Sequence, residues 1–330
     1  MPPKTPPSGE FALIARYFAP LSRGVPGAYD LTDDAAWIRA EPGLDWVVKT
    51  DAVVAGVHFL PDDPPDLIAR KALRVNLSDL ASKGATARFY LLDTVLPKDI
   101  DEAWIAGFAA GLAADQDEFG VKLIGGDTTS TPGVLTLAVM ALGQVETGRM
   151  LRRGTAQEGD DVYVSGTLGD ASLGLLVLRG GLTRLSPASR DFLVDRYRLP
   201  RPRMALGPAL LGLASAAMDV SDGLVADLGH ICETSGLGAV VEEDSAPLSP
   251  AVREALREHP ALIAPVLTGG DDYEILFTVP ATAREKVAAL ARKLNLPLTR
   301  IGTMRSGSGV KVLCEDGSER ALDVAGWQHF

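Results

Sequence analysis

Short acidic turns recur along this chain, most of them with Asp next to Gly, Ser or Thr, and any fold of the chain has to accommodate them. They occur at seven places: Asp33-Asp34, Thr50-Asp51, Ser78-Asp79, Gly125-Gly126-Asp127, Asp219, Asp222 and Gly269-Gly270-Asp271-Asp272. Carboxylates that a fold gathers repel one another unless a hard cation such as Mg²⁺ neutralises them. The pattern therefore predicts a fold that brings distant turns together around divalent metal, and phosphate is the usual ligand beside such ions.

The length and charge of the chain limit what it can be. A chain of 330 residues with 46% hydrophobic content exceeds the usual size of a single core, so two domains are expected. The 43 acidic residues outnumber the 32 basic ones and give a formal charge of −11. This charge opposes non-specific binding to nucleic acid or to an anionic membrane surface, so neither is an expected partner. A phosphorylated ligand would need local cations.

The sequence predicts a cytoplasmic protein. Cys232 and Cys314 have no CxxC spacing, so neither a disulfide framework nor a thiolate zinc site is indicated, and a reducing compartment is expected. The longest apolar stretch, Val134 to Leu142, is far shorter than the roughly 20 residues that a membrane-spanning helix needs. Residues 1–9 are Pro-rich and lack the apolar segment of a signal peptide, and we expect them to be disordered.

Alternating strand and helix patterns predict an α/β fold in two domains. The N-terminal domain, residues 10–148, is expected to hold helices at 10–19, 66–84 and 101–119 and strands at 46–50, 88–96, 121–124 and 134–145. A basic stretch bounded by Gly, residues 148–154, is expected to link it to a C-terminal α/β domain, residues 149–330. That domain is expected to hold strands at 161–165, 217–220, 238–241, 273–279, 298–303 and 310–314, with helices from Asp170, at 223–234 and at 281–294.

Each acidic turn has an ordinary structural explanation, because Asp beside Ser, Thr or Gly commonly caps a helix or closes a turn. Ser221-Asp222-Gly223, before a helical pattern, is a good example. Asp79 is harder to explain in this way, since it lies inside a helical pattern and Asp is a poor helix former. A strand that ends in Gly125-Gly126 would leave backbone N–H groups open to an anion, while Asp127 holds a cation. Seven independent caps would not all need acidic residues, so together the turns favour a site.

Familiar nucleotide-binding and nucleophile motifs do not occur in the sequence. There is no GxxxxGK[ST] phosphate loop and no GxGxxG after a strand. No GxSxG elbow is present, and neither Cys has a nearby His with a supporting Asn or Asp at a recognisable spacing. A bound nucleotide would therefore depend on metal ions for the charge neutralisation that a Lys provides elsewhere.

Seven runs resemble the thiamine-monophosphate kinases in order and spacing, from about Glu10 to the end of the chain. The runs are Glu10-Phe11-Ala12-Leu13-Ile14, Asp33-Asp34-Ala35-Ala36, Thr50-Asp51 with Gly56-Val57-His58-Phe59, Lys71 to Ala81, Gly125-Gly126-Asp127-Thr128-Thr129, Asp219 to Leu224 and Gly270-Asp271-Asp272-Tyr273-Glu274. Some of them also occur in related aminoimidazole ribonucleotide synthetases and selenophosphate synthetases. His58 and the terminal Gly326-Trp327-Gln328-His329-Phe330 narrow the resemblance to the thiamine family.

The resemblance implies a two-domain fold like that of aminoimidazole ribonucleotide synthetase, a homodimer formed by the N-terminal domain, and ATP-dependent phosphoryl transfer to thiamine monophosphate without a phosphoenzyme. It implies that several Mg²⁺ ions are held by Asp34, Thr50, Asp51, Asp79, Asp127, Asp219 and Asp222. It also implies ATP contacts from Gly126, Asp127, Arg153 and Ser221, substrate contacts from His58, Asp271 and Trp327, and catalytic roles for Asp127, Asp222 and Arg153. Such a transfer requires alignment and charge neutralisation rather than a protein nucleophile.

Three residues depart from the family's usual pattern. Thr32 stands where the family generally has Gly, Lys49 where Ser or Thr often helps to bind metal, and Asp271 where Glu is more usual. The ammonium of Lys49 is expected to displace one metal ion and to pair with Asp34 or Asp51 instead. The shorter side chain of Asp271 can contact the substrate directly or through water.

Two other functions stay open on the sequence alone. A synthetase of the same superfamily, similar to aminoimidazole ribonucleotide synthetase or selenophosphate synthetase, would share the acidic turns, although no feature of the chain favours such a substrate. A non-catalytic module for Mg²⁺ or nucleotide would bind ATP tightly without releasing ADP. Formation of ADP and thiamine diphosphate from ATP and thiamine monophosphate distinguishes the three.

Overall fold

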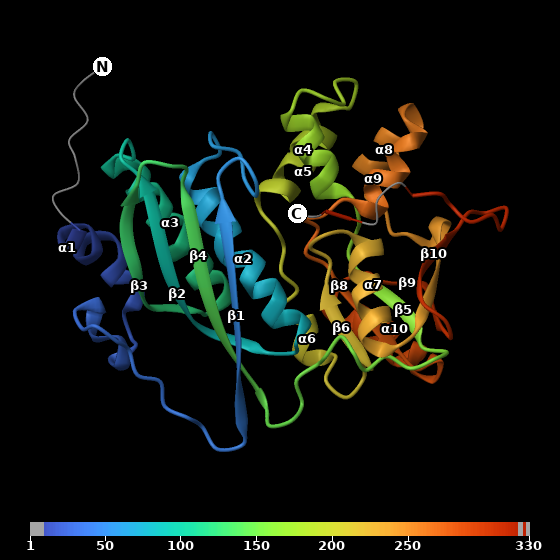
Figure 1. Ribbon diagram of the computed structural model, residues 1–330, viewed down its shortest axis with the longest axis horizontal. Helices are drawn as coiled ribbons and strands as arrows, with labels where there is room; N and C mark the ends of the chain where they lie inside the picture. The colour runs from blue at the N-terminus through green and yellow to red at the C-terminus, as the bar shows by residue number, and fades with distance from the viewer. Residues whose placement is uncertain (1–9, 323–325, 328–330) are drawn as a thin grey trace. The chain divides into compact units, whose positions relative to one another are not determined.

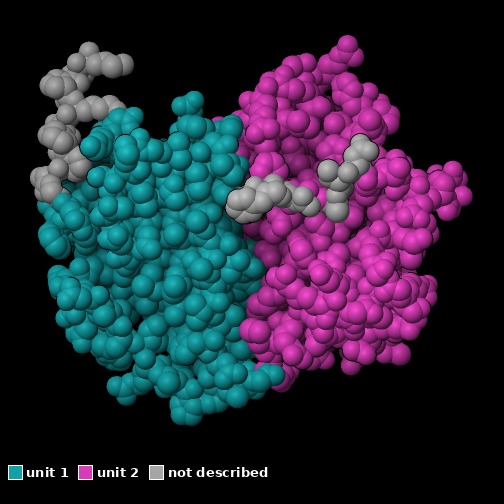
Figure 2. Space-filling view, in the orientation of Figure 1, with its two compact units in different colours: residues 1–80, 85–148 teal, residues 81–84, 149–330 magenta. Residues whose placement is uncertain are grey.

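The computed structural model describes residues 10–322 and 326–327 of the chain, and the expected disorder of residues 1–9 lies outside them. The chain divides into two compact units, which Figure 2 draws in different colours. Unit 1 runs to Gly148 without Ala81–Gly84, and unit 2 consists of Ala81–Gly84 and the chain from Arg149 onward. None of the helices within the described residues has the length and apolarity needed to cross a membrane.

Unit 1 is a four-stranded sheet with helices on one face (Figure 1). The strand order is β1-β4-β2-β3, with β1 (Leu44–Val54), β2 (Thr86–Pro97), β3 (Lys122–Thr131) and β4 (Thr136–Glu146). Strand β3 is parallel to β2, and the other pairs are antiparallel. The covering helices are α2 (Pro65–Ser82) and α3 (Glu102–Phe119), preceded in the chain by α1 (Glu10–Leu13), a π-helical turn (Ile14–Phe18) and 3₁₀ turns (Ala19–Ser22, Pro26–Leu31).

Buried and exposed side chains alternate along the strands, so this sheet has one buried face and one exposed face. In β1 the side chains of Val47 and Val53 are buried, whereas Val48 between them is 57% exposed. In β4, Val139 and Ala141 are buried, whereas Met140 is 40% exposed. Because successive side chains of a strand point to opposite faces, odd positions of β1 face the helices and even positions face outward. We call these the inner and outer faces of the sheet.

Unit 2 contains a six-stranded sheet of order β10-β7-β9-β5-β8-β6. Its strands are β5 (Asp161–Ser165), β6 (Ala216–Asp219), β7 (Gly238–Glu242), β8 (Ile275–Val279), β9 (Leu298–Arg305) and β10 (Gly309–Leu313). Strands β7 and β10 are parallel and the remaining pairs are antiparallel. The helices are α4 (Asp170–Leu178), α5 (Pro187–Arg198), α6 (Leu206–Ala209), α7 (Leu224–Ser235), α8 (Pro250–Glu258), α9 (Ile263–Thr268) and α10 (Arg284–Leu294).

Both faces of the second sheet are buried, as an α/β sheet with helices on two sides requires. Val162 and Val164 of β5 belong to a core that includes Leu228 of α7. Tyr163, which points the other way, stacks on Phe277 of β8 in the opposite core, with ring centroids 5.6 Å apart. Helices α4, α5, α8 and α9 share a further core of their own. The predicted α/β architecture is confirmed.

Two strands continue past the points where the sequence suggests that they end. Strand β1 runs through Asp51 to Val54, and β3 runs through Gly125-Gly126-Asp127 to Thr131. Gly126 is required by the neighbouring strand, because its φ is +145° and an added Cβ would lie 1.9 Å from the carbonyl oxygen of Leu92. The expectation that Gly125-Gly126 ends a strand is therefore wrong.

Helices α5, α8 and α9, together with the four-residue α6, have no counterpart among the expected elements. The first two carry clear start signals in the sequence, a Ser followed by Pro at the first helical position. Ser186 accepts a hydrogen bond from the backbone N–H of Ser189, and Ser249 from that of Val252. These signals make both helices recognisable from sequence, whereas the short α9 has no side-chain cap.

Candidate active site

Two predicted metal ligands of unit 1 meet on the inner face of the sheet, with a lysine between them. The ammonium of Lys49 lies 3.1 Å from Asp51 Oδ1 and 3.0 Å from Asp79 Oδ2. Lys49 and Asp51 are two residues apart in β1 and so share a face, and Asp79 comes from α2. The expected pairing of Lys49 with Asp51 is confirmed, but its second partner is Asp79 rather than Asp34.

A second acidic group lines a pocket of about 310 Å³ that the N-terminal segment forms with β2 and β3. Its lining includes four carboxylates, from Asp33, Asp34, Asp93 and Asp127. The apolar part of the lining comes from residues such as Ile14, Phe18, Leu31 and Leu91. No Lys or Arg is among the described residues of the lining, so the four carboxylates suit a hard cation.

The fold does not gather the predicted ligands of unit 1 into one cluster. Asp51 lies on the inner face in β1, whereas Asp127 pairs with Asp93 on the outer face in β3. Strands β1 and β3 are the two edges of the sheet, three strand spacings or about 14 Å apart. Thr50, next to Asp51, faces outward. Asp51 and Asp127 of one chain therefore cannot hold the same ion, which corrects the expectation of a single gathered site.

Asp93 is a candidate residue that the sequence analysis missed. It lies opposite Asp127 in the parallel β2–β3 ladder and lines the same pocket. The signal in the sequence was an Asp within a strand of mainly apolar and aromatic residues, because Asp is uncommon in strands.

His58 lies in the tight turn that follows β1. Its Nδ1 accepts a hydrogen bond from the backbone N–H of Val54 over 3.0 Å, and its own backbone N–H donates to the carbonyl of Val54 over 2.9 Å. A neutral ring whose Nδ1 accepts carries its proton on Nε2, so His58 presents a donor. Its contact with a substrate stays a prediction.

In unit 2, Asp219 is the last residue of β6, and Ser221 and Asp222 lie in the turn between β6 and α7. A residue that the sequence analysis missed holds this turn. One oxygen of the buried Asp227 accepts backbone N–H groups from Ser221, Asp222 and Gly223, over 2.9, 3.0 and 3.1 Å. Burial and the neighbouring Asp222 carboxylate raise the pKa of Asp227 to about 7, although these three hydrogen bonds act in the opposite direction.

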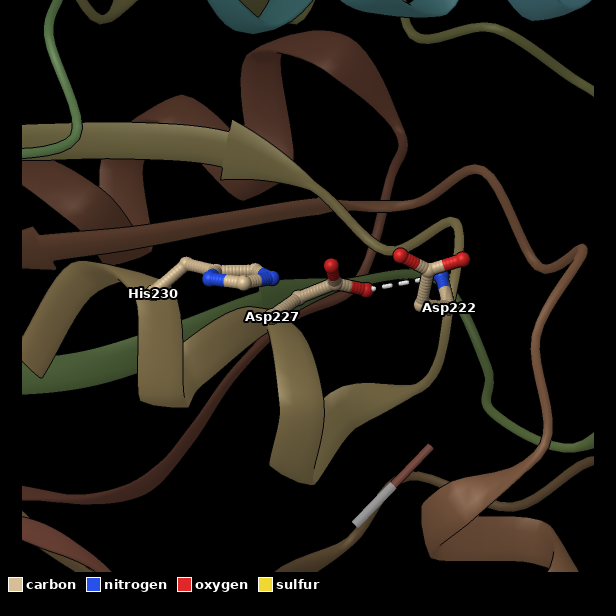
Figure 3. A group of neighbouring side chains, drawn as sticks. All are labelled: Asp222, Asp227 and His230. Atoms are coloured by element: carbon tan, nitrogen blue, oxygen red, sulfur yellow. Dashed lines mark hydrogen bonds between the residues drawn. The ribbon is translucent and has the colours of Figure 1, made fainter. Parts of the chain in front are cut away.

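His230 follows Asp227 by about one helical turn of α7. Ligand atoms of Asp222, Asp227 and His230 lie within 4.8 Å of one another (Figure 3). The repulsion between Asp222 and the buried Asp227 is the kind that a cation relieves, so the residues at this turn fit the Mg²⁺ ligation expected for Asp222.

The turn after α9 packs directly on the turn between β6 and α7. The backbone N–H of Asp271 donates to the carbonyl of Ser221 over 2.9 Å, and the hydroxyl of Tyr273 donates to Asp271 Oδ1 over 3.2 Å. The backbone N–H of Trp327 donates to the carbonyl of Asp222 over 3.0 Å, while Trp327 is 56% exposed. Unit 2 thus brings together Ser221, Asp222, Asp271 and Trp327, for which the family resemblance implies contacts with ATP, metal and substrate.

Arg153 lies at the other end of α7. Its carbonyl accepts a hydrogen bond from Ser235, the last residue of α7, whereas Ser221 precedes the first residue of that helix. A helix of 12 residues is about 18 Å long. The exposed Arg153 and Ser221 therefore lie too far apart for their backbones to border one phosphate, and within unit 2 they suit different parts of an extended ligand.

A buried network of hydrogen bonds and ion pairs holds the residues that follow Asp271. Asp272 accepts backbone N–H groups from Gly169 and Ala171, over 2.7 and 3.3 Å. Glu274 accepts from Arg196 over 3.0 Å and from Arg203 Nε over 2.6 Å. Burial, more than any other cause, raises the pKa of Asp272 well above its usual value. These side chains hold the turn in place.

Comparison with known proteins agrees with this architecture. Residues 32–145 match the family model for the N-terminal domain of AIR synthase related proteins, and residues 157–315 match the model for their C-terminal domain. The chain is 41% identical over 323 residues to thiamine-monophosphate kinase of Salmonella typhimurium, a match that covers 98% of each chain.

Solved structures give the same result. The crystal structure of thiamine-monophosphate kinase from Stenotrophomonas maltophilia K279a aligns with a TM-score of 0.80 at 44% identity, over 88% of this chain and 91% of that one. AaThiL complexed with AMPPCP and TMP aligns with a TM-score of 0.78 at 31% identity, over 98% of this chain and 97% of that one. The chain belongs to the thiamine-monophosphate kinase family, within the AIR synthase related proteins.

Proposed function

We propose that this protein transfers the γ-phosphoryl group of ATP to thiamine monophosphate, giving thiamine diphosphate and ADP. The observation that carries the proposal is the contact between the Ser221-Asp222 turn, the Asp271 turn and Trp327 in unit 2. Residues expected for nucleotide, metal and substrate come from three distant segments and meet there. The relationship to a kinase family, including AaThiL with AMPPCP, an ATP analogue, supports the same reaction.

ATP is proposed to bind in part at the pocket of unit 1. Apolar side chains such as Ile14 and Phe18 suit a base, and Gly126 and Asp127 line the polar part. The volume of about 310 Å³ is at the lower end of the roughly 300–1,000 Å³ usual for ligand pockets. In unit 2, Ser221 and Arg153 are proposed to contact other parts of the nucleotide, and Arg153 supplies a fixed positive charge for phosphate.

Mg²⁺ is proposed as the cation of the acidic groups. A Mg²⁺ ion held there would supply positive charge to neutralise the phosphates during transfer. The proposed ligands are Asp34, Thr50, Asp51, Asp79, Asp127, Asp219 and Asp222. Asp127 lies in strand β3 of unit 1 and Asp222 in the turn before α7 of unit 2, and each carboxylate is proposed to hold a cation next to phosphate.

Thiamine monophosphate is proposed to contact His58, Asp271 and Trp327. The exposed indole of Trp327 can lie against a cationic thiazolium or a flat pyrimidine ring. Asp271 is held at a φ of +72° by its hydrogen bond to Ser221, so its carboxylate has a defined direction. His58 offers a ring N–H to an acceptor on the substrate. A cytoplasmic location stays a prediction.

A homodimer through the outer face of the unit 1 sheet is part of this proposal. Apolar side chains are in register across that face, where Val48 faces Leu142 and Thr50 faces Met140. An exposed apolar sheet face is typical of an interface. A second copy packed there would bring another set of β2 and β3 carboxylates to the outer face, on which Thr50, Asp93 and Asp127 lie.

The dimer is tested by Val48→Arg, with Val134→Arg as the matched control. Both valines are 57% exposed, but Val134 lies in the loop before β4 and outside this face. Sedimentation of Val48→Arg is expected to show monomers, whereas the control sediments like the wild type. If the Val48→Arg protein is still a dimer, the interface does not lie on this face.

The reaction itself is tested by following ADP and thiamine diphosphate together. ATP with thiamine monophosphate is expected to give both products in equal amounts, and free thiamine and aminoimidazole ribonucleotide precursors serve as alternative acceptors. ADP release with only an aminoimidazole precursor would favour a synthetase. Tight ATP binding with no ADP release under any condition would favour a non-catalytic module.

A further inference from the structure

The Lys49 ammonium occupies the position between two carboxylates that a metal ion would otherwise take. It lies 3.1 Å from Asp51 Oδ1 and 3.0 Å from Asp79 Oδ2, and the side chains of Lys49, Asp51 and Asp79 are 33%, 38% and 21% exposed. The two acids come from different elements, β1 and α2, and the lysine lies at hydrogen-bond distance from both. A bridging Mg²⁺ would require oxygens about 2.0–2.1 Å from one point, and the ammonium fills that space.

The net charge of the three side chains also disfavours a divalent ion between Asp51 and Asp79. Two carboxylates and one ammonium leave a net charge of −1, whereas the carboxylates alone would present −2 to a cation. Divalent affinity at this pair falls with the ligand charge that remains.

An ordinary surface ion pair of the chain provides the contrast. Lys311 lies 3.3 Å from Glu319, with side chains 60% and 55% exposed. Pairs of this kind contribute little, because both side chains are solvated and mobile. Lys49 instead joins β1 to α2 through Asp79 and also pairs with Asp51 of its own strand, and these side chains are less exposed.

We propose that Lys49 is a built-in cation that replaces one divalent ion between Asp51 and Asp79. The inference rests on the proposed function in one respect, that these acids belong to the Mg²⁺ site. It follows that the chain binds one ion fewer than it would with a small neutral residue at position 49. It also follows that Asp79 is fixed relative to β1 before metal or nucleotide binds.

The test counts Mn²⁺ ions, detected by electron paramagnetic resonance, on the full-length protein without nucleotide. Lys49→Ser is expected to bind one more Mn²⁺ per chain than the wild type and to show a larger rise in Tm when Mn²⁺ is added. Lys49→Arg keeps the charge and is expected to bind the wild-type number. Lys311→Ser makes the same substitution in a surface pair and is expected to leave the number unchanged.

Equal Mn²⁺ counts and equal Tm shifts for Lys49→Ser, Lys49→Gln and the wild type would overturn the proposal. If both variants are unfolded without metal, refolding by millimolar Mg²⁺ supports it, because a divalent ion then does what the ammonium did. Failure of Mg²⁺ to refold them overturns it. The count is independent of product formation, so a wild type that makes no thiamine diphosphate would refute the proposed function and leave the result for Lys49 standing.

Discussion

Gly270→Ala is expected to separate the two turns that form the unit 2 part of the site. A Cβ at Gly270 would lie 2.2 Å from the carbonyl oxygen of Ser221, whereas ordinary contacts begin at 3.4 Å. Both sides of this contact are backbone, so no side chain can rotate to relieve it. The Asp271 turn must therefore move away from the Ser221 turn by about 1 Å, a shift that overpacking of this size requires.

The expected magnitudes follow from that shift. The 2.9 Å hydrogen bond from Asp271 N–H to Ser221 would stretch beyond bonding distance. Overpacking and the lost bond together cost about 2–4 kcal/mol, which corresponds to a drop in Tm of roughly 5–10 °C for a unit of this size. Because a misplacement of about 1 Å can cost on the order of 100-fold in rate, kcat/KM for thiamine monophosphate is expected to fall by about that factor.

Gly229→Ala is the matched control, since the same atom is added within unit 2. A Cβ there meets nothing within 4 Å, and the position lies inside α7, where Ala is favoured over Gly by about 0.5–1 kcal/mol. The control is expected to keep full activity and an equal or slightly higher Tm. Thermal melts and initial rates of thiamine diphosphate formation measure both variants. Wild-type kcat/KM in Gly270→Ala would refute the argument that contact between these turns positions the site.

Three further changes test individual roles. Asp127→Asn removes a negative charge at nearly constant volume, so kcat is expected to fall by about 100-fold or more. Near-normal turnover at saturating ATP and limiting Mg²⁺ would show that Asp127 has no role in catalysis. Trp327→Ala is expected to raise KM for thiamine monophosphate more than it lowers kcat, and an unchanged KM would remove Trp327 from the site. Asp161 has a pKa lowered chiefly by its hydrogen bond from Arg284 and also by Arg300. Its stabilising effect is fully present above the ordinary aspartate pKa of 3.8 and is lost as pH falls through the lower pKa of the folded state, so melts across acidic pH should show a flatter loss for Asp161→Asn than for the wild type.

Much of the fold was predictable because local signals and tertiary contacts agree. Helix α3 begins after Asp101, whose side chain accepts from the backbone N–H of Trp104, and ends at Gly120 with a φ of +68°. Both are standard cap signals. At Gly126 the local signal gave a wrong prediction. Glycine often marks the end of a strand, but here it lies within β3 because the carbonyl of Leu92 leaves no room for a side chain. Close approach between strands depends on a partner that the local sequence does not identify.

The sequence could not predict which proposed metal ligands of unit 1 lie on the inner face and which on the outer face, because this depends on strand register. Thr50 and Asp51 are adjacent in sequence, yet the strand places them on opposite faces. A shift of one residue would exchange them, and nothing in the run Thr50-Asp51 fixes which one faces the helices. The pairing of Thr50 with Met140 and of Asp51 with Val139 decides it, because Val139 is buried and Met140 is exposed.

The acidic run from Asp271 to Glu274 shows why residue type alone does not assign a role. Asp271 lies at the surface turn, whereas Asp272 and Glu274 are 1% and 0% exposed. Glu274 binds Arg196 and Arg203, whose positions in sequence are remote from it. Removing one partner of such a buried pair leaves the other charge unpaired and costs about 3–5 kcal/mol, whereas a change at Asp271 acts on whatever binds there. A loss of activity at Asp271 is therefore expected to report on the proposed substrate contact, whereas at Glu274 it reports on the structure that holds the Asp271 turn.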